Sequence, residues 1–136
     1  MTFYRLASVV DRLIAQGFSG QIGVTDFRYF PTDGKPYPAD FPSAQFLSEF
    51  AQFAADLARA TNRPGRVVFE VWNEPNLLGV FWPAKRDGVN EAKLFAKLLT
   101  QTTEAIHLAA PGSTVIAGGL FSYYDSYALD MMTEYN

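Results

Sequence analysis

The sequence predicts an α/β fold with three parallel strands, on the basis of element order and loop length. Apolar periodicity orders the chain as helix, strand, helix, strand, helix, strand, helix, with connections long enough for right-handed crossovers. Long loops follow the strands and short turns follow the helices, which is typical of a (β/α) barrel whose functional site lies at the strands' carboxyl ends. A complete barrel has eight such units and about 250 residues. We therefore expect residues 1–136 to form one incomplete (β/α)8 TIM barrel segment.

A doubly wound open sheet is the alternative architecture for this order of elements. Such a sheet carries a Gly-x-Gly-x-x-Gly phosphate-binding turn after its first strand. No turn of this kind follows any of the three predicted strands, so the barrel segment is preferred.

The first part of the chain predicts a helix, a short strand and a long loop. Residues 4–16 place apolar side chains on one stripe and end at Gly17, where a C-cap glycine belongs. Residues 21–25 fit a short strand. Residues 26–40 contain three prolines and Asp33-Gly34, so this segment cannot be regular throughout. Loops of this length in compact domains are usually functional.

The rest of the chain predicts two more strands and three helices. Residues 40–42 suit a helix start, and aromatic residues continue at helical spacing to residue 61. Residues 66–72 are nearly all apolar, which predicts a central strand covered on both faces. The elements expected after it are a loop at 76–89, a helix capped by Asn90, a strand over 114–117 and a helix over 126–134.

Composition argues against several classes of function. The net charge is -3 and the 11 Lys and Arg residues are scattered singly, so we expect neither nucleic acid nor a membrane surface as a partner. The absence of cysteine excludes disulfides and thiolate sites, and a lone histidine, His107, argues against a metal site. No apolar run approaches the roughly 20 residues that span a bilayer. The N-terminus lacks the pattern of a signal peptide, so we expect either a cytosolic protein or a missing leader.

The most informative feature is the point where Trp72-Asn73-Glu74-Pro75 ends the central strand. Side chains alternate along a strand, so Glu70, Trp72 and Glu74 should share one side while regular geometry lasts. Glycosidic bond hydrolysis uses two carboxyl groups about 5–9.5 Å apart, whereas Glu70 and Glu74 would lie roughly 13 Å apart on an extended strand. These two glutamates therefore cannot be the pair. Glu74, at the tip, is the better catalytic candidate, and Glu70 is expected to be structural with an Arg or Lys partner.

This motif also carries a resemblance to a known group of enzymes. Residues 69–77, followed by Phe81-Trp82-Pro83, resemble the fourth-strand signature of the retaining glycoside hydrolases of clan A, closest to glycoside hydrolase family 39 and related endoglycosidases. Residues 110–119 resemble the segment that leads into the fifth strand of those proteins. The chain would then correspond to roughly the third to fifth barrel units.

The resemblance implies a role for each residue of the motif. Glu74 would be the general acid/base, and Asn73 would contact the 2-hydroxyl of the sugar at the cleavage point. The nucleophile would be a glutamate at the end of the seventh barrel strand, which this chain does not contain. No cofactor is implied, and the substrate would be an oligosaccharide or polysaccharide.

Other side chains near the predicted strand ends are weaker candidates. We expect sugar contacts from Asp26, which follows the first strand, and from the aromatic residues Trp72 and Trp82. Asp125 could approach Glu74, although a subsite or loop-capping role fits it better. The further aromatic candidates in loops are Tyr29, Tyr37, Phe121 and Tyr124. His107 lies late in a helix and is expected to pack there or to be exposed.

Two alternatives to the enzyme remain open at this stage. The chain could be a carbohydrate-binding fragment without turnover, because its acid lacks a partner. It could also self-associate, because a piece with three strands leaves two open sheet edges. An extracellular or periplasmic full-length parent is compatible with the resemblance.

Overall fold

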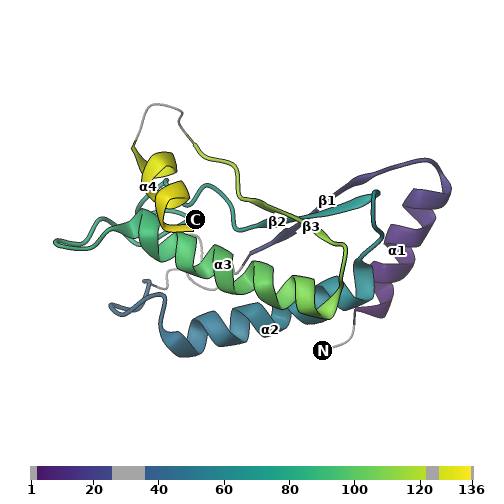
Figure 1. Ribbon diagram of the computed structural model, residues 1–136, viewed down its shortest axis with the longest axis horizontal. Helices are drawn as coiled ribbons and strands as arrows, with labels where there is room; N and C mark the ends of the chain where they lie inside the picture. The colour runs from purple at the N-terminus through teal and green to yellow at the C-terminus, as the bar shows by residue number, and fades with distance from the viewer. Residues whose placement is uncertain (1–2, 26–35, 122–125, 136) are drawn as a thin grey trace.

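The computed structural model describes residues 3–25, 36–121 and 126–135, and within them helices and strands alternate as predicted (Figure 1). The elements are α1 (Tyr4–Ala15), β1 (Gly20–Val24), α2 (Ala44–Thr61), β2 (Val67–Val71), α3 (Glu91–Ala109), β3 (Thr114–Ala117) and α4 (Tyr127–Tyr135). The three strands are parallel and follow the order β1-β2-β3. The predicted α/β class with three parallel strands is confirmed.

The described part of the chain forms two layers, with helices on one face of the sheet. Figure 1 shows α2 and α3 side by side on the same side of the three strands. Successive right-handed crossovers between strands in sequential order place their helices on the same face. Phe69 pairs with Ile22 of β1 and Val115 of β3, and these residues belong to the row that faces the helices.

The opposite face of the sheet is open, which corrects the expectation that residues 66–72 are covered on both faces. Burial alternates along β2: Val67, Phe69 and Val71 are buried, whereas Val68 and Glu70 are only half-buried. The neighbouring positions of that open face, Gln21, Thr114 and Ile116, are exposed. The apolar composition of β2 suggested two covered faces, but both crossover helices lie on one.

An aromatic cluster fills the core between the sheet and the helices near the end of β2. Trp72 and Trp82 pack with ring centroids 5.6 Å apart, and Phe41 packs against Trp82 at 5.2 Å. Phe46 and Phe50 of α2 reach the same cluster at helical spacing. Aromatic side chains bury a large apolar area each, so this cluster supplies much of the stabilisation at the carboxyl end of the sheet.

Local capping explains where the helices begin and end. The Asn90 side chain accepts a hydrogen bond from the Lys93 N–H at 3.1 Å, which confirms the predicted cap of α3. α2 begins at Ala44 rather than at residues 40–42, because Ser43 accepts from the Phe46 N–H at 3.0 Å. Gly17 follows α1 with a φ of 91°, in the left-handed conformation predicted for a C-cap glycine.

α1 is connected to the rest of the described chain by an exposed ion pair. Arg63, in the turn after α2, donates two hydrogen bonds to Asp11 of α1, at 2.8 and 3.1 Å. These hydrogen bonds, with a smaller Coulombic contribution, lower the pKa of Asp11, and partial burial opposes them. Asp11 has a lower pKa in the folded state than in the unfolded state, where the pKa is about 4, so ionised Asp11 stabilises the fold above about pH 4. This stabilisation is lost as the pH falls through the folded-state pKa.

We expect Arg63→Ala to raise the pKa of Asp11 towards its ordinary value and to remove this part of the acid dependence of stability. The measurement is a titration of the Asp11 carboxyl carbon by NMR. Arg59→Ala is the matched control, because Arg59 pairs with Asp56 at 2.8 Å instead. An Asp11 titration that is the same in both variants would contradict the assignment.

Candidate active site at the tips of the second and third strands

The backbone at the tip of β2 leaves regular strand geometry immediately after Val71. Trp72 and Glu74 have positive φ angles of 71° and 41°, a conformation that non-glycine residues adopt rarely and that concentrates at functional sites. The neighbouring strands hold this backbone in place. The Trp72 N–H donates to the Val24 carbonyl at 2.9 Å, and the Glu74 N–H donates to the Gly119 carbonyl at 3.0 Å.

The side chains of Asn73 and Glu74 lie beyond the end of β2, as predicted. Asn73 is exposed and Glu74 is half-buried. Neither side chain makes a hydrogen bond or an ion pair with the residues the structure describes. A carboxyl group and an amide are therefore both available to a ligand at the carboxyl edge of the sheet.

Trp72 turns away from this edge, which corrects two expectations. Its indole is only 1% exposed and donates to the Phe81 carbonyl at 2.6 Å. The positive φ of Trp72 ends the strand alternation, so its side chain does not lie on the open face with Glu70. It joins the helix-facing core against Phe50. A buried ring has no free face for a sugar, so the predicted contact between Trp72 and substrate does not fit this placement.

Trp82 is also part of the core, and the prediction that it contacts substrate does not fit its placement either. Its ring is 0% exposed and packs edge-on against Phe95 of α3 at 5.7 Å. Its indole N–H donates to Glu91 at 2.9 Å. The loop after β2 folds back over the sheet end, so that this ring fills the aromatic cluster.

The structure reveals a buried ionic network that the sequence analysis did not identify. Glu91, the first residue of α3, is 5% exposed and accepts two hydrogen bonds from Arg86, at 2.7 and 2.6 Å. Arg86 also donates to the Ala39 carbonyl at 3.1 Å. The hydrogen bonds to Glu91 raise the pKa of Arg86, against a smaller effect of burial. The network connects the loop after Glu74 to α3 and to residue 39.

Glu70 has partners different from those predicted. Its carboxylate accepts from the Gln21 side chain at 2.6 Å and from the Gly119 N–H at 3.0 Å, rather than from an Arg or Lys. Glu70 lies on the open face of the sheet and is half-buried. Neutral donors are sufficient there because solvent still reaches the carboxylate.

The other predicted candidates are dispersed or lie outside the described residues. Asp26, Asp125, Tyr29 and Tyr124 are in the part of the chain that the structure does not describe. Tyr37 is half-buried and its hydroxyl donates to the Val80 carbonyl at 3.4 Å. Phe121 is 62% exposed, and its N–H donates to the Asn76 side chain at 2.9 Å. His107 is exposed near the end of α3, away from the strand tips, as expected.

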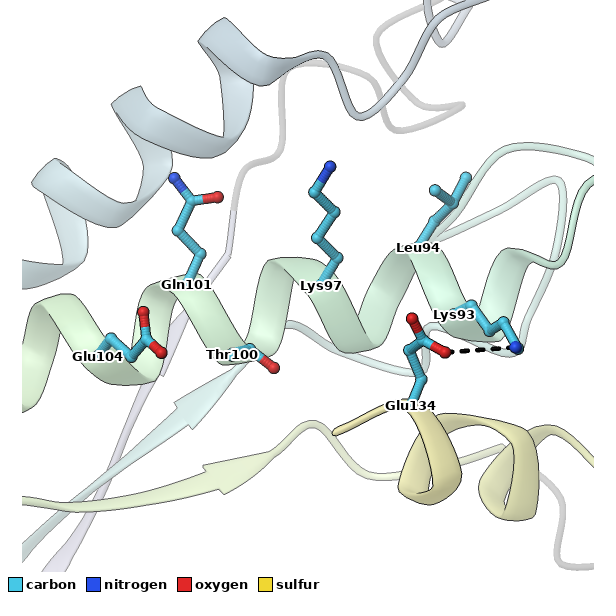
Figure 2. A pocket seen from close by; sticks show the side chains of 7 residues that line it. All are labelled: Lys93, Leu94, Lys97, Thr100, Gln101, Glu104 and Glu134. Carbon is cyan, nitrogen blue, oxygen red and sulfur yellow. Dashed lines mark ion pairs between the residues drawn. The ribbon is translucent and has the colours of Figure 1, made fainter. Parts of the chain in front are cut away.

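The described surface has further hollows, including one lined by charged and polar side chains of the loop before α3 and of α4, such as Asp87 and Asp130. Another hollow, of about 590 Å³, lies beside α3 and α4. Figure 2 shows that Glu134 points towards Lys93 there. Their charged atoms are 3.3 Å apart. Both side chains are about half exposed, and surface pairs of this kind contribute little. The described residues contain no cluster of three His, Asp or Glu side chains that could hold a metal ion. Among the described helices, none has the length and apolarity needed to cross a bilayer.

No family model and no curated protein matches this chain.

Proposed function

We propose that this chain is the central part of a retaining glycoside hydrolase in which Glu74 is the general acid/base. One observation carries the proposal. The Glu74 carboxyl group stands without a partner among the described residues, next to the exposed amide of Asn73 and at the carboxyl end of a parallel sheet. Function concentrates at this edge in α/β folds.

The proposed mechanism is a double displacement. Glu74 donates a proton to the departing glycosidic oxygen while a carboxylate from outside this chain attacks the anomeric carbon. Glu74 then removes a proton from the water that hydrolyses the glycosyl-enzyme intermediate. Asn73 hydrogen-bonds a hydroxyl of the same sugar. The two carboxyl groups of a retaining site lie about 5–5.5 Å apart, so the nucleophile must come within this distance of the Glu74 carboxyl group.

We further propose that the three strands belong to a (β/α)8 barrel. A hollow of about 220 Å³ lies between α1 and the free edge of β1, and it is lined mostly by apolar side chains. Leu6, Val9 and Leu13 of α1 face it and are 37–48% exposed. A further parallel strand beside β1 would cover these side chains. Self-association through the open edges of the sheet remains a second prediction for the same surface.

The test of the proposed function is Glu74→Gln in the glycosidase that carries this chain. We expect kcat/KM to fall by about 100-fold or more on aryl glycosides with poor leaving groups, because glutamine cannot donate the proton. The loss should be smaller with leaving groups that depart without protonation. Glu49→Gln, on the exposed side of α2, is the control and should keep full activity. Unchanged activity of Glu74→Gln on poor leaving groups would refute the proposal.

A carbohydrate-binding fragment without turnover is the second candidate for the isolated chain. The observation that favours it concerns Glu70, the other carboxyl group of the same strand. Both of its oxygens already accept hydrogen bonds, so it does not supply the second carboxyl group that hydrolysis requires. Because both tryptophans are buried, their fluorescence is a poor probe of binding. The side-chain amide resonance of Asn73 should instead shift when an oligosaccharide is added, without any release of product.

A further inference from the structure

We infer that Glu70 is a positioning residue for Glu74 and acts through Gly119. The effect of Glu70 on catalysis rests on the proposed function. The connection from Glu70 through Gly119 to Glu74 can be tested without measuring any activity. Three hydrogen bonds define the connection: Gln21 donates to Glu70 at 2.6 Å, the Gly119 N–H donates to Glu70 at 3.0 Å, and the Glu74 N–H donates to the Gly119 carbonyl at 3.0 Å.

The register of the sheet explains how Glu70 reaches both partners. Gln21 and Glu70 lie on the open face of adjacent strands, where Gln21 pairs with Val68, two residues before Glu70. On the other side, Ile116 of β3 pairs with Glu70, and Gly119 lies three residues further along the chain. The carboxylate therefore joins β1 to the segment that follows β3.

Gly119 needs this restraint because glycine has wide backbone freedom. Glu70 fixes its N–H, and the Glu74 N–H bonds to its carbonyl, so both polar groups of Gly119 are held in place. Glu74 itself has a φ of 41°, which persists only where the surroundings impose it. Removing the acceptor on Glu70 releases Gly119 and, with it, the support of the Glu74 backbone.

Glu70 is better placed for this role than for a chemical step. Each of its oxygens already accepts a hydrogen bond, and regular strand geometry separates its position from the strand tip. The Gly119 N–H is at an exposed residue, so water can replace the carboxylate when it is removed. The loss of Glu70 should therefore change the local geometry of Glu74 much more than the global stability.

The test is amide hydrogen exchange of this chain, measured by NMR. In Glu70→Leu, exchange of the Glu74 N–H should accelerate by about tenfold or more, because its acceptor is no longer held. Glu70→Gln should stay within about threefold of the original rate, because its oxygen still accepts from Gly119 and its amide donates to the Gln21 oxygen once the Gln21 side chain flips. The Trp72 N–H, bonded to Val24, is the internal reference and should not change.

Three outcomes would overturn the inference. The first is an unchanged exchange rate of the Glu74 N–H in Glu70→Leu. The second is an equal acceleration of exchange at the Trp72 N–H, which would indicate general loosening of the sheet. The third is an exchange rate of the Glu74 N–H that is as fast in Glu70→Gln as in Glu70→Leu. If Glu70→Leu does not fold, Gln21→Ala replaces it and should accelerate exchange at Glu74 to an intermediate degree. No acceleration in Gln21→Ala would then reject the inference.

An activity measurement separates this inference from the proposed function. In the active glycosidase, Glu70→Leu should lower kcat by about tenfold with little change in KM, and Glu70→Gln should restore it. If no polypeptide carrying this chain cleaves glycosides, the proposed function fails while the exchange rates still decide the contact. If the enzyme is active and Glu70→Leu keeps the original kcat, the positioning role fails alone.

Discussion

Replacing Glu91 by alanine is expected to lower the free energy of unfolding by about 2–4 kcal/mol, because it removes a buried carboxylate that Trp82 and the partly buried Arg86 both use as acceptor. Glu91 is 5% exposed and accepts hydrogen bonds from both Arg86 and Trp82. Without it, the indole N–H of Trp82 has no acceptor in a core position that is 0% exposed. An unsatisfied buried donor adds its own desolvation penalty.

Urea unfolding of this chain measures the effect, with two comparison variants. Glu91→Gln retains an oxygen acceptor for Trp82 but loses the charge that Arg86 requires, so it should fall between the original protein and Glu91→Ala. Glu104→Ala removes an exposed glutamate from the same helix and should change stability by less than about 0.5 kcal/mol. A loss below about 1 kcal/mol in Glu91→Ala would show that the network does not support the loop.

This network bears on the candidate site because it fixes the segment that follows Glu74. Trp72 donates to the Phe81 carbonyl, Trp82 donates to Glu91, and Arg86 bonds both to Glu91 and to the Ala39 carbonyl. The loop after β2 is therefore attached to the core at several points. In the proposed mechanism this attachment would keep the Glu74 carboxyl group in a defined direction, which general acid catalysis requires.

The alternation of strands and helices could be predicted because it depends on local patterns. Apolar spacing identified α2 and β2, and the position of Asn90 before an apolar stripe identified the start of α3. The location of Glu74 beyond the end of β2 followed from the same pattern, because the apolar run stops at a proline. These features can be predicted from residues that are close together in the sequence.

The environment of the two tryptophans could not be predicted because it depends on tertiary packing. Strand alternation placed Trp72 beside Glu74, but the positive φ of Trp72 reversed its direction into the core. Trp82 lies in a loop, where nothing local distinguishes a ring that floors a ligand site from one that fills a cluster. The Arg86 and Glu91 pair likewise forms only once the loop folds back onto α3.

The close approach of β3 to the tip of β2 makes Gly118→Ala the second substitution with a large expected effect. A Cβ at residue 118 would lie 2.6 Å from the Trp72 carbonyl oxygen and 3.0 Å from the Val71 oxygen. These are backbone atoms of a hydrogen-bonded sheet and cannot rotate away as a side chain can. The strands must separate, which weakens the bond from the Gly118 N–H to the Val71 carbonyl, now 2.8 Å. We expect a loss of about 3 kcal/mol.

Gly119→Ala is the matched control, one residue along the same backbone. The nearest heavy atom outside the adjoining residues, Oε1 of Glu70, would lie 3.9 Å from its added Cβ, which is ordinary van der Waals contact. Because alanine restricts the unfolded chain more than glycine does, Gly119→Ala should be neutral or up to about 1 kcal/mol more stable. Thermal and urea unfolding should therefore show a loss of stability in Gly118→Ala and no loss in Gly119→Ala. If both lose the same stability, the destabilisation comes from glycine freedom in this segment rather than from contact between the strand tips.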